Sequence, residues 1–566
     1  MLNDKQRKVV FELKGNTIVS ASPGSGKTKT IVARAQHKLE SIPVHKSLAL
    51  ITYTNAGADE ISCRLPDRDN TVFIGTIHRF CLEFILRPFG WLYDWYKPRV
   101  ITYDELLEFV ALNPDFDLGD SPLDEINKIK KALDGSLDKD VEWKNATTLE
   151  YIAEVYYAFL DTKRAIDFNE ILYRSYKIIS ENDFVSTSLA NKFYETSIDE
   201  FQDTNIYQYE ILKAINQKGI CTFFMVGDEK QRIYRFAGAI DNAFEKASVD
   251  FTAPIEILEV TYRSTTNIIN AYSSLFENHP VLTNGSKYKS IDYKVILEET
   301  KKANHDSVID SYVNHFINKV NVDPSEIAIL SLQWRDALNV SKGLRNKYRI
   351  VGLGALPHKS INNSTFNLIR SICKFLFSSS VKNLRIIRRA IELHILENNL
   401  SISDSEFNFI TNSLISKFSH IDRTFTLLQG LFELQNVFDS VFKISHAAFN
   451  EILNLLDEEE IKFWTFEKYI ETLSGISGIT INTIHQAKGL EYEVVILNQI
   501  NENKIPHQRY LGRNGNDYIY APLTKESIED GRTLFYVGIS RAKSALVILH
   551  NWKPSLFIPT IYEANK

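Results

Sequence analysis

The sequence predicts an α/β protein with two blocks of parallel sheet, each interrupted by a mostly helical segment. Strand and helix signals alternate from the N-terminus, where Thr17–Ala21 and Ser47–Thr52 are short apolar runs separated by a glycine turn and a helical stretch. The alternation returns at about residues 185–262, near 326–332 and at about 479–550. Between about 370 and 472 the apolar residues follow a helical period instead. Strands that alternate with helices are typical of parallel sheets.

Length and composition indicate a multidomain protein with packed cores. The chain has 566 residues, of which 44% are hydrophobic and 24% charged, which suits about three or four domains and excludes disordered and collagen-like classes. Its apolar runs stop short of the ~18 residues that a membrane helix needs, and the N-terminus is not of signal-peptide type. We expect a cytoplasmic protein whose widely spaced cysteines are reduced and bind no metal: Cys63, Cys81, Cys221 and Cys373.

The net charge of −6 is unevenly distributed. Residues 104–142 hold twelve Asp and Glu against four Lys, which leaves the rest of the chain at about +2. This acidic stretch is typical of a solvated helical surface. A protein covered with basic residues for nucleic-acid binding is therefore excluded, and any such binding needs a local track.

A phosphate-binding loop follows the first predicted strand. The sequence from Ala21 to Thr28 places glycines and a lysine between a strand and a helix, so that backbone N–H groups of Ser22, Gly24, Ser25 and Gly26 can surround phosphate oxygens. Lys27 would reach the β- and γ-phosphates, and the Thr28 hydroxyl would bind Mg²⁺. Ala21 stands where the pattern has glycine, which makes this a variant P-loop. The alternative is an ordinary strand-to-helix turn.

Carboxylates at the ends of two other predicted strands complete this chemistry. Asp199 and Glu200 end an apolar strand, and we expect Asp199 to contact the metal and Glu200 to polarise the attacking water. Gln231 follows the next strand and has the reach to sense a γ-phosphate. Adjacent acids on an ordinary surface are the alternative explanation.

Two downstream arginines are candidates for stabilising the transition state. Arg263 and Arg541 would act as arginine fingers if a second lobe carries them to the P-loop, an effect typically worth ~10³–10⁵ in rate. Alone, either could be a surface ion-pair residue.

The motifs, in their order along the chain, resemble those of superfamily 1 helicases of the UvrD/Rep type. They extend from the first residues almost to the end of the chain: 2–6, 21–28, 52–55, 75–78, 199–203, 227–238, 262–264, 483–491 and 536–542. The resemblance implies two RecA-like P-loop lobes and an enzyme that hydrolyses ATP with Mg²⁺ while moving on single-stranded or tailed DNA, with 3′→5′ polarity.

The resemblance also implies roles for individual residues. Gln6 would read adenine, Tyr262 would stack on it, Lys29 would lie over the base, Glu491 would contact the ribose, and Arg263 and Arg541 would be the two fingers. The expected DNA contacts are Tyr53, Thr54, Asn55, Thr76, His78, Tyr234, Phe236, Thr483 and His485. Aromatic faces stack on any base without reading sequence. The aromatic residues could instead belong to the core, and His78 could be a buried histidine.

Several positions depart from the family pattern. Lys29 and Phe236 replace a usual arginine and tryptophan, while Ala56 and Ala237 replace basic residues. Most of these losses fall on the DNA side, so ATPase chemistry is better supported than vigorous unwinding. The alternative function is a DNA-end-sensing ATPase that activates a partner nuclease and unwinds little.

The insertions predict the domain boundaries. We expect a first lobe at 1–82 and 165–260 with a helical insert at 83–164, and a second lobe at 261–370 and 473–566 with a reduced helical insert at 371–472. The small inserts also resemble the helicase-like subunit (GajB) of the Gabija anti-phage system. That resemblance implies antiviral defence beside an OLD-family nuclease partner (GajA-like).

Overall fold

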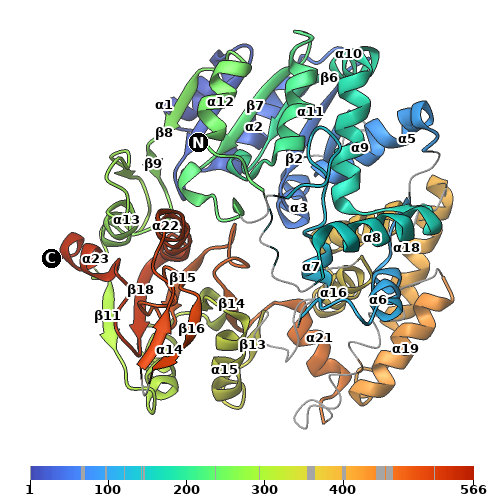
Figure 1. Ribbon diagram of the computed structural model, residues 1–566. Helices are drawn as coiled ribbons and strands as arrows, with labels where there is room; N and C mark the ends of the chain where they lie inside the picture. Colours follow the sequence, from blue (N-terminus) through green and yellow to red (C-terminus); the bar gives the residue numbers. More distant parts are fainter. Residues whose placement is uncertain are drawn as a thin grey trace.

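The computed structural model contains two parallel sheets with helical segments between and beside them (Figure 1). It describes residues 2–65, 71–95, 99–119, 122–139, 141, 143, 147–235, 238–291, 293–352, 364–397, 403–441, 453, 463–514 and 517–566. Phe236 and Ala237 lie outside these described residues.

The first sheet has six strands in the order β3-β2-β6-β7-β1-β8, all parallel. Their bounds are β1 Thr17–Ala21, β2 Ser47–Thr52, β3 Val72–Thr76, β6 Phe193–Ile198, β7 Thr222–Gly227 and β8 Ile255–Leu258. Successive side chains of a strand point to opposite faces, so Val19 and Ala21 pack in one core while Ile18 packs in the other. β1 lies beside β7, and β7 lies beside β6, so the carboxyl ends of these three parallel strands are adjacent.

Helices cover the two faces of this sheet, as the upper half of Figure 1 shows. α1 Asp4–Arg7, η1 Lys8–Glu12, α2 Lys27–Leu39 and α3 Asn55–Arg64 come from the first part of the chain, followed by α4 Ile77–Cys81 and η2 Leu82–Leu86. The returning part of the chain supplies α9 Phe168–Glu181, α10 Asp183–Lys192, α11 Ile206–Asn216 and α12 Ala243–Asp250, with short turns η4 Phe201–Asp203 and η5 Glu229–Gln231.

The second sheet also has six parallel strands, in the order β11-β18-β15-β12-β14-β13. They are β11 Ile296–Glu299, β12 Ile327–Ser331, β13 Ile350–Val351, β14 Ile479–Thr483, β15 Tyr492–Leu497 and β18 Ala542–His550. The helices packed around it are α13 Thr266–Ser273, α14 His305–Asn318, α15 Trp334–Leu344, α22 Lys525–Ile539 and α23 Ile558–Ala564. A short parallel pair, β9 Val260–Thr261 with β10 Thr283–Asn284, lies where the chain passes between the sheets.

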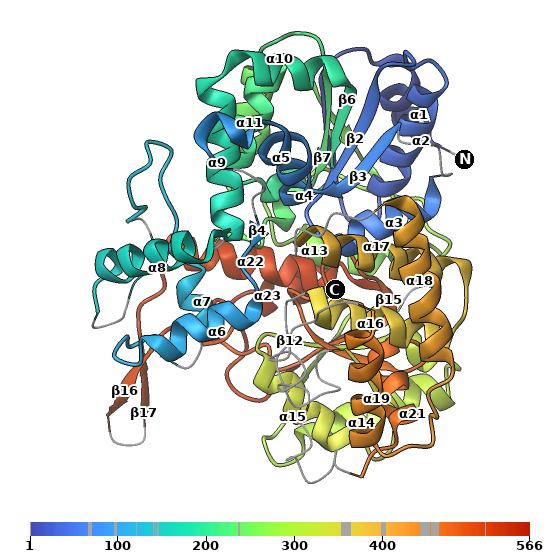
Figure 2. The ribbon, with the colours of Figure 1, turned by 90° about the vertical axis from the view of Figure 1, so that its right-hand side faces the viewer.

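Two mostly helical segments interrupt the sheets and lie to either side below the first sheet (Figure 2). The first contains α5 Arg87–Phe89, η3 Gly90–Tyr93, β4 Arg99–Val100, α6 Tyr103–Leu112, α7 Pro122–Ile126, α8 Leu149–Lys163 and β5 Ala165–Ile166. The second contains α16 Ser364–Phe377, α17 Val381–Glu397, α18 Asp404–Ser419, α19 Leu427–Asp439 and α21 Phe466–Ser474. Each segment has its own apolar core.

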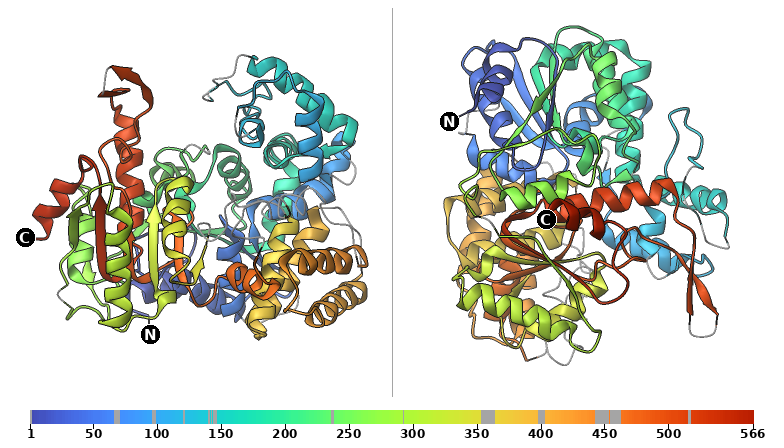
Figure 3. Two further views of the ribbon diagram at one scale, coloured as in Figure 1. Left: turned by 90° about the horizontal axis from the view of Figure 1, so that it is seen from below. Right: turned by 90° about the vertical axis from the view of Figure 1, so that its left-hand side faces the viewer.

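A two-stranded antiparallel hairpin, β16 Tyr510–Asn514 with β17 Asp517–Tyr520, projects from the second sheet region (Figure 3). No helix among the described residues is long and apolar enough to cross a bilayer.

The predicted α/β class with parallel sheets is confirmed by the two sheets. The strands Thr17–Ala21 and Ser47–Thr52 have the predicted bounds, whereas β6 ends at Ile198, one residue before Asp199. The residue-level domain boundaries stay a prediction, although the chain leaves the first sheet after β3 and returns at β6.

Candidate nucleotide and nucleic-acid site

The P-loop connects β1 to α2 and carries two glycines in the left-handed region. Gly24 has φ +73° and Gly26 has φ +84°, a conformation that side chains with a Cβ rarely adopt. A Cβ on Gly24 would also lie 2.4 Å from the Cβ of Arg263. The hydroxyl of Thr261 donates to the carbonyl of Pro23 at 2.8 Å, and the amide of Tyr262 donates to the carbonyl of Gly24 at 2.9 Å. The loop is therefore fixed against the crossing point between the two sheets.

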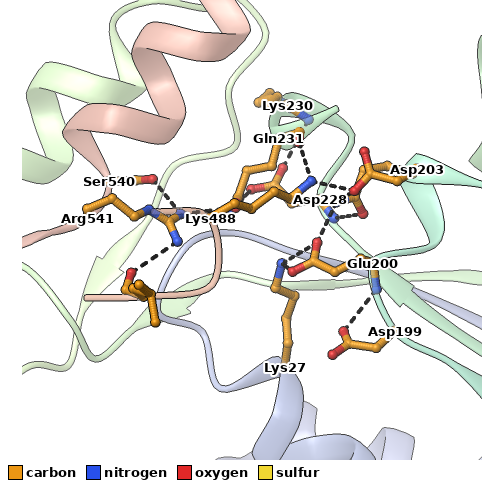
Figure 4. A network of polar contacts seen from close by, with 12 residues as sticks. Lys27, Asp199, Glu200, Asp203, Asp228, Lys230, Gln231, Lys488, Ser540 and Arg541 are labelled. Carbon is orange, nitrogen blue, oxygen red and sulfur yellow. Dashed lines mark hydrogen bonds and ion pairs between the residues drawn. The ribbon is translucent and has the colours of Figure 1, made fainter. Parts of the chain in front are cut away.

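Lys27 and the two acids after β6 meet at the carboxyl end of the first sheet (Figure 4). Lys27 Nζ lies 3.3 Å from each carboxylate oxygen of Glu200. Burial acts to raise the pKa of Glu200, but Lys27 and Lys488 outweigh it and hold that pKa below its ordinary value. Burial and the neighbouring Glu200 instead raise the pKa of Asp199. The site thus holds an ionised Glu200 beside a carboxyl group that a bound cation would stabilise in its charged form.

Gln202 holds Glu200 in a fixed orientation. Its amide nitrogen donates to Glu200 Oε2 at 2.5 Å, and its amide oxygen accepts from the backbone N–H of Asp228 at 2.9 Å. Glu200 itself has a left-handed backbone with φ 54°. A non-glycine residue in that region costs free energy and is typical of functional sites.

Gln231 and Arg541 form a contact between the two sheets. Arg541 Nη2 donates to Gln231 Oε1 at 3.1 Å, while Gln231 Nε2 donates to Asp228 Oδ2 at 2.8 Å. Arg541 is 2% exposed and follows α22. Burial and the nearby Arg263 lower the pKa of Arg541 to about 9. A second cationic group is therefore placed next to the predicted γ-phosphate sensor.

Arg263 reaches the same contact region from the chain after β9. Its Nε donates to Glu491 Oε2 at 2.8 Å and its Nη1 donates to the carbonyl of Ser540 at 2.9 Å. Glu491 also lies 3.6 Å from Lys543. Arg263 and Arg541 are thus adjacent in space although they are far apart in the sequence.

Lys488 makes an ion pair that joins the two sheets and that the sequence did not assign. Its Nζ contacts Asp203 Oδ2 and donates to the carbonyl of Gln231 at 2.8 Å. The side chains of Lys488 and Asp203 are 7% and 0% exposed. Burial raises the pKa of Asp203 to about 6 in spite of this pairing.

Gln6 and Tyr262 lie at the other end of the P-loop, where the resemblance places adenine. Gln6 is 1% exposed, and its amide nitrogen donates to the carbonyl of Ser25 at 2.8 Å. Asn3 connects the two residues, because its backbone N–H donates to Gln6 Oε1 at 3.0 Å and its side chain donates to the Tyr262 hydroxyl at 2.9 Å. Tyr262 is 42% exposed, so its ring is available to a base.

A cleft of about 630 Å³ runs between the lobes over these groups. The predicted site residues that line it are Gly24, Gly26, Lys27, Thr28, Lys29, Tyr53, Thr54, Asp199, Glu200, Gln231, Tyr234, Tyr262, Arg263, Glu491 and Arg541. Ser22 and Ser25 are buried in the loop beneath it, and the Ser25 hydroxyl has no hydrogen-bond partner within the described part of the chain. The glycines, the lysine and this unsatisfied hydroxyl suit the phosphates of a nucleoside triphosphate, and the Thr28 and Asp199 oxygens suit Mg²⁺.

The predicted DNA contacts are less completely brought together. The rings of Tyr53 and Tyr234 stack at 4.7 Å between centroids, and Lys488 Nζ lies 5.0 Å from the Tyr234 ring centre. Thr54 and Thr76 cap α3 and α4 by accepting backbone N–H groups, and Asn55 is exposed at the start of α3. Thr483 ends β14, and burial lowers the pKa of the following His485.

His78 packs edge-to-face on Phe168, with ring centroids 5.4 Å apart. Burial lowers the pKa of His78 to about 4, so the imidazole is neutral at pH 7. His78 lines a pocket of about 350 Å³ together with Tyr53 and Asn169. The predicted contact Phe236 lies outside the described residues.

Sequence reasoning missed Lys488, Asp203, Asp228 and Gln202 as site residues. A local signal existed for each, because Asp203 and Gln202 follow the acid pair, Asp228 precedes Gln231, and Lys488 precedes Glu491 by three positions. Their pairing could not be predicted, since it depends on how the two sheets face each other.

The fold and cleft define a P-loop nucleoside triphosphatase whose site is shared by two lobes of parallel sheet. Residues 2–252 match the UvrD/REP helicase N-terminal domain, and residues 382–552 match the UvrD-like helicase C-terminal domain. The chain belongs to the UvrD/Rep-like superfamily 1 DNA helicases, a family of ATP-dependent enzymes.

Three relatives show how far this similarity extends. A probable DNA helicase II homologue of Mycoplasma genitalium is 26% identical over 100% of this chain and 88% of its own length. The ATP-dependent DNA helicase PcrA of Staphylococcus aureus is 24% identical over 98% of this chain and 84% of its own. The ATP-dependent DNA helicase Rep of Buchnera aphidicola is 22% identical over 96% of this chain and 92% of its own length.

Proposed function

We propose that the protein hydrolyses ATP between its lobes and uses the resulting closing and opening to move along single-stranded DNA in the 3′→5′ direction. The observation that carries this proposal is the composition of the cleft. The first lobe supplies Lys27 and Glu200, whereas Arg263 and Arg541 come from the chain beyond β9. Neither set is sufficient alone, so turnover requires the lobes to be together.

The hydrolytic roles follow from the geometry. Glu200 takes the proton of the attacking water, and Gln202 keeps its carboxylate aimed into the cleft. Lys27, Arg263 and Arg541 stabilise the negative charge that develops on the transferred phosphoryl group, and Gln231 senses its presence. Mg²⁺, held by Thr28 and Asp199, would neutralise phosphate charge when bound with ATP.

The stacked tyrosines connect this chemistry to the DNA side. Tyr53 follows β2, Tyr234 follows η5, and Lys488 of the second lobe lies over the Tyr234 ring. Lys488 also contacts the carbonyl of Gln231. A change in the separation of the lobes therefore moves a group that touches both the phosphate sensor and an aromatic DNA contact.

ATP hydrolysis in the presence and absence of single-stranded DNA tests the proposal. We expect DNA to stimulate the rate, because DNA bound across both lobes favours the closed, complete site. A rate that DNA does not change would contradict coupling between ATP turnover and DNA.

The second candidate is a DNA-end-sensing ATPase that activates a nuclease and unwinds little. It is favoured by the exposed Ala56 at the start of α3, where a basic side chain would add a phosphate contact. Strand displacement from a tailed duplex separates the two functions. ATP-dependent displacement by the isolated protein supports the helicase, and DNA-stimulated hydrolysis without displacement supports the sensor.

The proposed defence role rests on the sequence alone. The relatives named above are DNA helicase II, PcrA and Rep proteins, and none of these names refers to anti-phage defence. An OLD-family nuclease partner and a cytoplasmic location stay predictions. Copurification with the product of a neighbouring nuclease gene tests the former.

A further inference from the structure

A second groove of similar size lies outside the nucleotide cleft. This groove, of about 640 Å³, runs along the free edge strand β3 of the first sheet and is lined by α3, α4, η2 and α17. We call it the edge groove. Its floor belongs to the first lobe, and its opposite wall is the helix α17 of the second helical segment, which lies below α3 in Figure 2.

Ion pairs hold α17 against the first lobe and define one part of the groove. Arg389 Nε lies 3.1 Å from Asp59 Oδ1, and Arg389 also donates to the hydroxyl of Ser62 at 3.0 Å and to the carbonyl of Ile74 at 3.2 Å. Arg79 lies 3.5 Å from Glu392 of α17. Arg389, Arg79 and their acidic partners therefore have a structural role, because they attach α17 to the first lobe.

The charge of the groove lining is positive. The described residues that line it include five cationic side chains, namely Arg79, Lys192, Arg385, Arg388 and Arg389, against the three acids Asp59, Glu83 and Glu392. Lys192 lies over the rings of Phe84 and Phe193, at 5.3 and 5.9 Å. Arg388 donates to the neutral amide of Asn408 at 3.0 Å. The groove is thus electropositive in a protein whose net charge is −6.

Aromatic rings line the same groove. Phe73 of β3 and Phe193 of β6 are buried, at 7% and 1% exposed, and Phe84 of η2 packs against the same core, so these rings form the apolar floor of the groove and do not stack on bases. A positively charged groove that follows the backbone is a feature by which proteins bind single-stranded nucleic acid without reading sequence.

The edge groove begins beside a predicted DNA contact. β3 ends at Thr76, whose hydroxyl accepts the backbone N–H of Arg79 at 3.4 Å, and Arg79 lines the groove. A DNA strand that touches Thr76 therefore reaches the end of the groove at the cationic Arg79.

We propose that the edge groove is an additional binding site for the backbone of single-stranded DNA, outside the track between the lobes, with Lys192 and Arg388 as its phosphate contacts. This inference rests on the proposed function, because it assumes that the protein binds DNA. Its consequence is that long single strands gain contacts that short ones cannot make.

The test compares two oligonucleotide lengths in the Lys192→Gln/Arg388→Gln double variant. A short strand of about 8 nucleotides fits within the ~4–16 that single-strand sites cover, and a long strand has about 30. Each lost phosphate contact lowers the slope of log affinity against log salt by about 0.7, so two lower it by about 1.4. We expect this loss for the long strand only, with short-strand affinity and short-strand ATPase stimulation unchanged.

A matched control carries Lys319→Gln and Lys342→Gln, which remove two exposed charges on the second lobe. It should keep the wild-type slope for each length. Unchanged long-strand binding in the groove variant, or an equal loss for both lengths, would overturn the edge-groove site while leaving the proposed function intact. Failure of the wild-type protein to bind either strand would instead overturn the proposed function and this inference together.

Discussion

Glu200 shows how single residues create the hydrolytic site. Its backbone is held in the left-handed region at φ 54°, and three groups direct its carboxylate: Lys27, Gln202 and, through its positive field, Lys488. These forces keep the carboxylate ionised and oriented before any substrate enters. A pre-oriented base is what general-base catalysis requires.

Replacing this base while keeping its shape gives the first residue-scale prediction. Glu200→Gln should lower the ATPase kcat by about 10²–10⁴-fold, the usual range for a general base, with ATP binding retained because Lys27 and the P-loop are unchanged. Turnover assays and equilibrium binding of a fluorescent ATP analogue measure the two effects. Near wild-type turnover would remove Glu200 from the role of base.

At this scale the motifs predicted individual residues of both lobes, including Arg263 and Arg541, but not the side-chain pairs that join the lobes. Lys27, Asp199 and Gln231 follow neighbouring strands, and parallel strands of one sheet must bring such positions together. The buried pair of Lys488 and Asp203 joins residues from different sheets. No local periodicity specifies such a pair, because it depends on how the sheets are docked.

At the scale of elements, α9 begins at a buried carboxyl group that links it to the first helical segment. Asp167 caps α9 by accepting the N–H of Glu170 at 2.7 Å and also accepts the Tyr156 hydroxyl at 3.1 Å. Burial raises the pKa of Asp167 to about 6, a direction that Glu170 reinforces and that Lys131 and the two hydrogen bonds oppose.

This raised pKa predicts a pH-dependent stability. The native state keeps the proton of Asp167 to a higher pH than the unfolded chain, whose Asp pKa is about 3.9, so ionisation destabilises the fold as pH rises through 6. Asp167→Asn removes this effect. In urea unfolding, the stability of the variant relative to wild type should therefore be about 1 kcal/mol more favourable at pH 7 than at pH 5. A pH-independent difference would contradict the assigned ionisation.

The docking of α17 on α3 is a second element-scale feature with a testable consequence. Arg389→Ala and Asp59→Ala each break the same ion pair, so each should increase hydrogen exchange of amides in β3 and α17. The double variant should exchange little faster than either single variant, because the interaction is lost only once. Fully additive effects would mean that the two residues act independently.

The sequence predicted the helical character of the second segment but not its docking. The apolar period around Leu384, Ile387 and Ile391 specifies an amphipathic helix, and Ile387 and Ile391 are buried in its core. Arg389 of the same helix, however, contacts the carbonyl of Ile74 in the first lobe. The edge groove exists only because of that tertiary contact, and therefore no motif indicated it.

At the scale of the whole molecule, the cleft lies between two lobes that hold complementary parts of one catalytic set. Arg541 contacts Gln231, and Lys488 contacts Asp203 and the Gln231 carbonyl, so the lobes already touch through the groups that would respond to a γ-phosphate. The same arrangement explains why ATP turnover and DNA movement would be coupled.

The most direct test of this coupling is displacement of streptavidin from a biotinylated single-stranded oligonucleotide. We expect the wild-type protein, with ATP, to displace streptavidin from the 5′ end, and we expect Glu200→Gln, which binds ATP without turnover, to leave it bound. ATP hydrolysis by the wild-type protein with no displacement from either end would contradict the account of this protein as an ATP-driven DNA translocase.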